Sequence, residues 1–210
     1  MPENEYLAGI TMPQKSQSSV STSYNSSSAA LYADTYALNN NSLFGTVSGA
    51  DCANFVSQCV WAGYISWHSS MPSSTVQSFI ANDYKMVTGQ DDNNWYMGPN
   101  TGHINWTGLN SFASFLTNTS KSYGPTGTIF NNNKSYTDLP IILITPGKAI
   151  QMKISSSYNH SAFIYSSTGN TLANKLCAAH SSNQKTTVAS FAVVYPYIRL
   201  LSFNTSDFAS

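Results

Sequence analysis

The sequence predicts an α+β domain in which helices come first and an antiparallel sheet follows. Apolar residues recur at helical spacing only within about the first 120 residues. From residue 148 onward, short segments alternate between apolar and polar residues, with no helical pattern between them. Consecutive strands without intervening helices favour antiparallel pairing, because parallel neighbours need a long crossover.

The first two helices are predicted from apolar spacing and from the residues at their ends. One is expected over 28–39, with its N-cap among the serines of 26–28. The second is expected over 51–63, with Asp51 as N-cap and Gly63 at its C-terminal end. An apolar stripe inside the second helix indicates a buried position.

The middle of the chain is less regular. A short helix is expected near 74–82, and a third clear helix over 107–117. Residues 118–138 are rich in Asn, Gly and Thr, which are typical of turns, so a long loop is expected there.

The strands are predicted from alternation with a period of two. The candidate strands are 148–154, 160–166, 172–179 and 187–201. In the second of them, His160 shares a face with Ala162 and Ile164, and Ser161 and Phe163 lie on the other face.

Length and composition indicate one folded domain. The chain has 210 residues, of which 41% are hydrophobic and 13% aromatic, enough for a sizeable core. Residues 1–27 include a serine-rich stretch and are expected to form a flexible arm, and 28–210 the domain.

Charge and hydropathy narrow the possible partners. Only 9% of residues are charged and the net charge is zero, which disfavours nucleic acid and anionic membranes as partners. No apolar run approaches the roughly 18 residues of a transmembrane helix, and no signal-peptide core is present. A surface rich in Ser, Thr and Asn is more usual outside cells, so an extracellular or wall-associated protein, or a phage lysin, is expected.

Three cysteines and four histidines are the residues that suggest chemistry. Cys52 is expected at a helix N-terminus, where the helix dipole favours the thiolate. His160 and His180 lie at or beside predicted strands that could bring their side chains together. A thiolate paired with an imidazole performs acyl transfer. The pattern alone leaves this open against three buried structural thiols, Cys59 and Cys177 included.

Several separated segments resemble the putative amidase domain family, which is similar to NlpC-type, papain-like cell-wall peptidases. Residues 51–58 (DCANFVSQ) resemble its DCxNFVSQ signature, and 159–162 (NHSA) resemble its DHSAIV strand. Further resemblances occur, in the family's order, at 32–37 (YADTYA), 62–63 (AG), 105–106 with 112–116, 146–151 (PGKAIQ) and 180–183 (HSSN). The resemblance covers about 29–185. The acidic residues of the family's GDxIQ and DHSAIV segments are replaced here.

The resemblance implies a papain-like α+β fold and a cysteine amidase or endopeptidase. It implies Cys52 as nucleophile and His160 as base, with His180, or alternatively Asn183, as the third polar group. A thioester would form on Cys52 and be hydrolysed by water, and the Cys52 N–H would contribute to the oxyanion hole.

Supporting roles are expected for four further residues. Asp51 is expected as an N-cap in preference to a catalytic acid, and Gln58 is expected to pack behind the nucleophile. Trp61 and Trp106 are candidates for a substrate groove, although core packing suits them equally well.

The expected substrate is the peptide part of bacterial peptidoglycan, by analogy with the family. A monomer without metal or cofactor is expected, with neither nucleic-acid binding nor membrane insertion. Two other function classes stay open: a non-catalytic wall-binding module on the same fold, and a transglutaminase-like acyl transferase.

Overall fold

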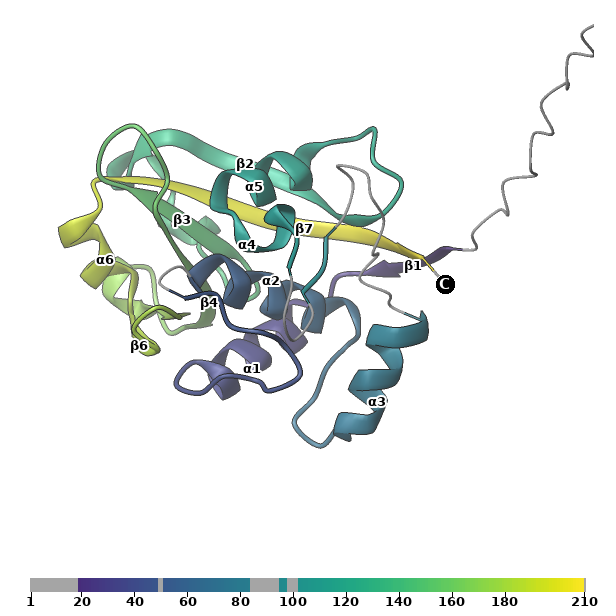
Figure 1. The fold of residues 1–210 in the computed structure, drawn as a ribbon. Helices are drawn as coiled ribbons and strands as arrows, with labels where there is room; N and C mark the ends of the chain where they lie inside the picture. Colours follow the sequence, from purple (N-terminus) through teal and green to yellow (C-terminus); the bar gives the residue numbers. More distant parts are fainter. Residues whose placement is uncertain (1–18, 49–50, 84–94, 98–101, 210) are drawn as a thin grey trace, which may run out of the picture.

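The computed structural model describes residues 19–48, 51–83, 95–97 and 102–209. Within them, helices pack on an antiparallel sheet (Figure 1). The helices are α1 (Ser26–Tyr36), α2 (Asp51–Tyr64), α3 (Ser73–Ser78), η1 (Phe79–Asp83), α4 (Ile104–Thr107), α5 (Leu109–Thr117), η2 (Tyr136–Asp138), η3 (Ile141–Leu143), η4 (Leu172–Asn174) and α6 (Val188–Val194). The strands are β1 (Ser19–Ser23), β2 (Gly124–Ser135), β3 (Ala149–Lys153), β4 (His160–Ser167), β5 (Lys175–Ala179), β6 (Gln184–Thr187) and β7 (Tyr197–Ala209).

The sheet has the order β1-β7-β3-β4-β5-β6, and β2 also pairs with β7. Strand β7 runs along the length of the molecule and its C-terminal end lies beside β1 (Figure 1). All the strand pairs in the described residues are antiparallel. The α+β class predicted from the sequence is therefore confirmed.

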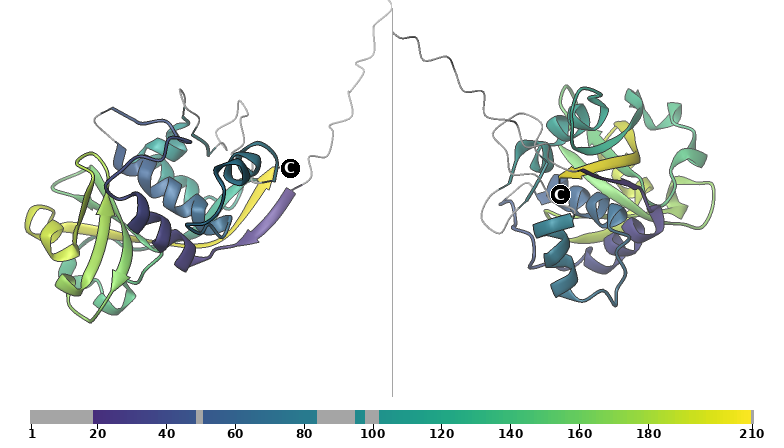
Figure 2. Two further views of the ribbon diagram at one scale, coloured as in Figure 1. Left: turned by 90° about the horizontal axis from the view of Figure 1, so that it is seen from below. Right: turned by 90° about the vertical axis from the view of Figure 1, so that its right-hand side faces the viewer.

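The two faces of the sheet carry separate cores. One core joins α1 and α2 to alternate residues of the central strands, Ala149, Phe163, Ala178 and Leu201 among them. The other joins α6 to the residues on the opposite face, such as Ile150, Ala162 and Leu200. Figure 2 shows α2 lying along the sheet beside α1. These two faces decide which histidine approaches α2.

Helix α2 is buried along its whole length. Its apolar positions pack against the sheet, and its polar positions meet other buried polar groups. At its end, a Cβ on Gly63 would lie 2.4 Å from the Tyr24 ring, so only glycine allows this close approach.

Several boundaries differ from those predicted. The predicted helix over 28–39 is α1, which begins at Ser26 with Asn25 as its N-cap. Asp51 lies within α2 and its carboxylate accepts from the preceding loop, so it is not a simple N-cap. The predicted helix over 107–117 is divided at Gly108 into α4 and α5.

Three predictions about chain conformation were wrong. Part of the expected flexible arm, Ser19–Ser23, forms β1 against β7; residues 1–18 lie outside the described part. The expected loop over 118–138 contains β2, whose Asn- and Gly-rich sequence is held by pairing with β7. The expected strand over 187–201 is interrupted by α6, which begins at the side-chain cap of Thr187.

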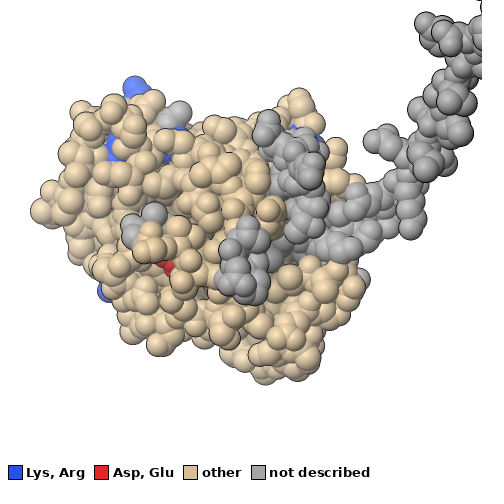
Figure 3. Space-filling view, viewed as in Figure 1, with Lys and Arg blue, Asp and Glu red and all other residues tan. Residues whose placement is uncertain are grey.

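The described residues contain no helix that is both long and apolar enough to cross a membrane. The face drawn in Figure 3 has few charged side chains, as the composition predicts.

Candidate active site

Cys52 lies in the first turn of α2 and borders a pocket of about 380 Å³. The residue is 5% exposed. The other lining residues come from the α4–α5 region, from the start of β4 and from the turn after β5: Ala53, Thr107, Gly108, Leu109, Asn110, Ser111, Tyr158, Asn159 and Ser181. A thiol at a helix N-terminus beside a pocket is suitably placed to attack a bound carbonyl group.

The Asp51 carboxylate, next to Cys52, accepts three hydrogen bonds. Its Oδ1 accepts from the Val47 N–H at 2.8 Å and from Asn54 Nδ2 at 2.7 Å, and its Oδ2 lies 2.9 Å from His180 Nδ1. Burial acts to raise the pKa of Asp51, but these hydrogen bonds outweigh burial and lower it. Asp51 is therefore ionised at neutral pH.

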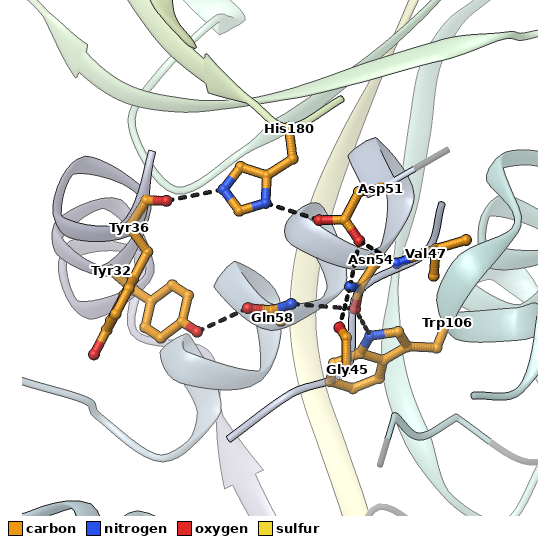
Figure 4. A network of polar contacts seen from close by, with 9 residues as sticks. All are labelled: Tyr32, Tyr36, Gly45, Val47, Asp51, Asn54, Gln58, Trp106 and His180. Carbon is orange, nitrogen blue, oxygen red and sulfur yellow. Dashed lines mark hydrogen bonds and ion pairs between the residues drawn. The ribbon is translucent and has the colours of Figure 1, made fainter. Parts of the chain in front are cut away.

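His180, directly after β5, links α1 to α2. Its Nε2 lies 2.8 Å from the Tyr36 carbonyl oxygen, on the other side of the ring from Asp51 (Figure 4). A carbonyl and a carboxylate can only accept, so each ring nitrogen of His180 faces a hydrogen-bond acceptor. The ring stacks on Phe55 at 3.9 Å between centroids. With His180 1% exposed, the two side chains form a buried ion pair.

A chain of buried hydrogen bonds extends from this ion pair along α2 (Figure 4). Asn54 Oδ1 accepts from Gln58 Nε2 at 3.2 Å and from Trp106 Nε1 at 2.8 Å. Gln58 Oε1 in turn accepts from the Tyr32 hydroxyl at 2.9 Å. Gln58 is therefore buried within α2 and bonded to Tyr32 and Asn54. Asn54 and Gln58 are engaged with protein groups and do not line the pocket.

His160 lies on the other face of the sheet. It is the first residue of β4, and its ring packs against Phe191 of α6 and stacks on Tyr195. It shares this face with Ala162, whereas α2 packs on the face that carries Phe163. Burial lowers the pKa of His160, which favours the neutral imidazole at neutral pH.

The two strand histidines are therefore not brought together. Phe163 pairs with Ala178 on the face that α2 covers, and His180, two residues after Ala178, stacks on Phe55 of α2. His160 then belongs to the opposite face, because side chains alternate along a strand. The expectation that adjacent strands bring the two rings together was wrong, because His160 packs on α6 and His180 on α2.

The other candidates occupy different surroundings. Trp61 and Trp106 are both 0% exposed and belong to the core, so the expectation of a substrate groove was wrong for them. Asn183 lies in an exposed turn between β5 and β6, with a positive φ of 39°. The polar partner of His180 is Asp51, and not Asn183.

The remaining two cysteines are buried in the cores, as predicted. Cys59 lies two turns after Cys52 on α2, and Cys177 lies on β5. Burial raises the pKa of Cys59, and raises that of Cys177 to about 12. Both thiols are thus kept protonated at neutral pH.

Some site residues were missed from the sequence. Asn110, Tyr158, Asn159 and Ser181 line the pocket although no motif marks the first two. Asp51, Asn54 and Gln58 are spaced by three and four residues, and this spacing in the sequence predicts that they share one face of a helix. In the described residues, no three side chains among His, Cys, Asp and Glu are grouped as metal ligands.

The sequence matches one family of known proteins. The family model described as a putative amidase domain matches residues 23–200, which include α1, α2 and the central strands. Neither the curated proteins nor the solved structures contain a significant match.

Proposed function

The chain belongs to the putative amidase domain family, and we propose that it is a cysteine amidase with Cys52 as its nucleophile. The observation that supports this proposal most strongly is that Cys52 borders a pocket at the start of a helix. Cys59 and Cys177, both fully buried in the cores, cannot meet a substrate. A papain-like arrangement of helix and sheet is part of this proposal.

His180 is proposed as the imidazole of the reaction. It contacts α2 through Asp51, the neighbour of Cys52, and it stacks on Phe55 one turn further along. Asp51 then has the role of the group that holds the imidazole and compensates its charge. His160, which packs on α6, is assigned a structural role.

The proposed reaction proceeds through a thioester. The Cys52 thiolate attacks the amide carbonyl, forming the S–C bond, and the Cys52 N–H stabilises the oxyanion. For the proton transfer the proposal requires the buried His180 ring, which does not line the pocket, to turn toward it, so that Nε2 leaves the Tyr36 carbonyl and donates to the leaving nitrogen. The C–N bond breaks as the amine takes this proton. Water, deprotonated by the neutral imidazole, then hydrolyses the thioester and restores thiolate and imidazolium.

The proposed substrates are the stem or cross-link peptides of bacterial peptidoglycan. The analogy with NlpC-type peptidases supports this choice, and so does the scarcity of charge in the sequence, which is usual for proteins of the cell exterior. Extracellular or wall-associated action, including that of a phage lysin, follows from the same proposal. A monomer is part of the same proposal.

The decisive experiment incubates wild type, Cys52→Ser and Cys59→Ala with purified peptidoglycan and identifies soluble fragments by mass spectrometry. Wild type and Cys59→Ala are expected to release peptides whose masses locate the cleaved bond, and Cys52→Ser none. Circular dichroism shows whether each variant is folded.

Two other outcomes would replace this proposal. Release of nothing by any protein, with retained binding to the wall, would favour a binding module. Incorporation of an added primary amine into the peptides, in place of hydrolysis, would indicate a transglutaminase-like acyl transferase.

A further inference from the structure

A buried cation, Arg199, contacts residues that form one wall of the Cys52 pocket. Arg199 of β7 is 6% exposed, and its Nη2 donates to Asn110 Oδ1 at 3.1 Å and to the Leu109 carbonyl at 3.4 Å. Its guanidinium carbon lies 3.8 Å from the centre of the Tyr158 ring. All three of these neighbours line the pocket.

A second cation lies on the same aromatic ring. Lys153 of β3 is 8% exposed, and its Nζ lies 5.2 Å from the centre of the Tyr158 ring. Its hydrogen bond, of 2.6 Å, goes to the neutral Asn133 Oδ1. Two positive side chains therefore support a single pocket residue.

Neither cation has a countercharge within the described residues. The ion pairs found there involve other side chains, and Arg199 Nε donates to the neutral Gln151 Oε1 at 2.7 Å. Arginine stays protonated in proteins even when burial lowers its pKa, as burial does for Arg199. A buried charge without a partner is unfavourable, so a bound anion would stabilise this region.

The groups in front of the cations are hydrogen-bond donors. Residues 108–111 line the pocket and include the first turn of α5, whose N-cap Gly108 supplies no side-chain hydrogen bond. The N–H groups of a first turn have no partner within their helix. Because Asn110 Oδ1 accepts from Arg199, its Nδ2 remains as the amide donor. These donors add to the attraction that the two cations create.

From this arrangement we propose that the pocket selects substrates with a carboxylate close to the scissile amide, held at the start of α5 and attracted by Arg199 and Lys153. The substrates are thus peptide acids and not their neutral amides. This inference deepens the proposed function, since it requires that the Cys52 pocket is the substrate site.

The test uses alkylation of Cys52 by two reagents that differ in charge, and needs no knowledge of the natural substrate. Iodoacetate carries a carboxylate and iodoacetamide is neutral; the rate of each at Cys52 is measured by peptide mass spectrometry. The iodoacetate-to-iodoacetamide rate ratio in wild type is expected to exceed that of N-acetylcysteinamide by about tenfold, and to fall as salt is added.

Variants distinguish the effect of Arg199 and Lys153 on this rate ratio from any effect of His180. Asn110→Asp places a carboxylate beside Arg199 at an exposed position, and is expected to lower the ratio about tenfold. Lys153→Gln is expected to lower it several-fold. Two matched controls should leave the ratio unchanged. They are Asn204→Asp, at an exposed position of β7, and Lys185→Gln, in an exposed ion pair.

A second measurement tests the inference even if Cys52 is alkylated too slowly for the two rates to be compared. N-acetylglycine should raise the melting temperature of wild type more than N-acetylglycinamide does at equal ionic strength, and Asn110→Asp should remove this difference. Equal melting shifts, or a rate ratio that neither variant changes, would overturn the inference. Neither readout depends on hydrolysis, so an inactive protein with a high ratio would refute the proposed function alone.

Discussion

His180 Nδ1 lies 2.9 Å from Asp51 Oδ2, although 129 residues separate the two in sequence. The ion pair joins the turn after β5 to the first turn of α2, and the hydrogen bond to Tyr36 adds the end of α1. Cys52 follows Asp51 directly, so the position of the proposed nucleophile depends on contacts between three distant segments.

Removing either partner of this buried ion pair should destabilise the fold strongly. Asp51→Asn and His180→Gln are each expected to lower the free energy of unfolding by about 3–5 kcal/mol, because each leaves a buried group without its partner. Urea denaturation of both single variants and the double variant measures the effect. The double variant should lose less than the sum of the two.

The exposed pair between Asp34 and Lys185 serves as the control. Its partners lie 2.6 Å apart but are 48% and 36% exposed, so Lys185→Gln should cost at most about 1 kcal/mol. If the buried and exposed pairs gave equal losses, burial would not govern the contribution of the Asp51–His180 pair.

The two strand histidines should differ sharply in their effect on activity. In variants that remain folded, His180→Gln is expected to lower kcat at least about 100-fold, as loss of a proton-transferring group does. His160→Phe should retain amidase activity within a few-fold, because a phenyl ring preserves the packing on Phe191 and Tyr195. Rates of peptide release from peptidoglycan provide the comparison. A folded but inactive His160→Phe would return the role of base to His160.

Acid should destabilise the protein in two separate ranges of pH. Burial lowers the pKa of His160 from 6.5, so below pH 6.5 the unfolded chain takes up a proton first and stability falls toward the folded pKa. The pKa of Asp51 is lowered from 3.8, so its contribution is present above pH 3.8 and is lost as pH falls through the folded pKa.

Urea unfolding at a series of pH values resolves the two ranges. His160→Phe should remove the loss that begins near pH 6.5 and leave the loss below pH 3.8. A wild-type stability that stays constant from pH 7 to pH 5 would contradict the assignment of His160 to an apolar site.

The elements with clear periodicity could be predicted from the sequence, and those held by pairing could not. The alternation of 160–166 already placed His160 with Ala162 and apart from Phe163, as the two cores confirm. The face that α2 covers depends on packing between distant segments, so the pattern did not decide which histidine meets α2. Strand β2 could not be predicted, because its sequence is rich in Asn and Gly and it forms a strand by pairing with β7.

The candidate site, too, could be predicted from the sequence only in part. The octapeptide at 51–58 predicted the position of Cys52 at the start of a buried helix. The partner of Asp51 could not be predicted, since a hydrogen bond across 129 residues has no local signature. Trp61 and Trp106 were ambiguous for a different reason, because aromatic residues suit a groove and a core equally well in composition.

The three thiols should react in a fixed order with a small neutral reagent. Iodoacetamide at pH 7 is expected to label Cys52 at least about 100-fold faster than Cys59 or Cys177, because only thiolates react and burial keeps the other two thiols protonated. The Cys52 pocket also gives access, whereas the other two side chains are fully buried. Peptide mapping after timed quenching measures each rate. Labelling of all three at one rate would mean that reaction occurs through global unfolding, and Cys52 would then lose its claim to be the nucleophile.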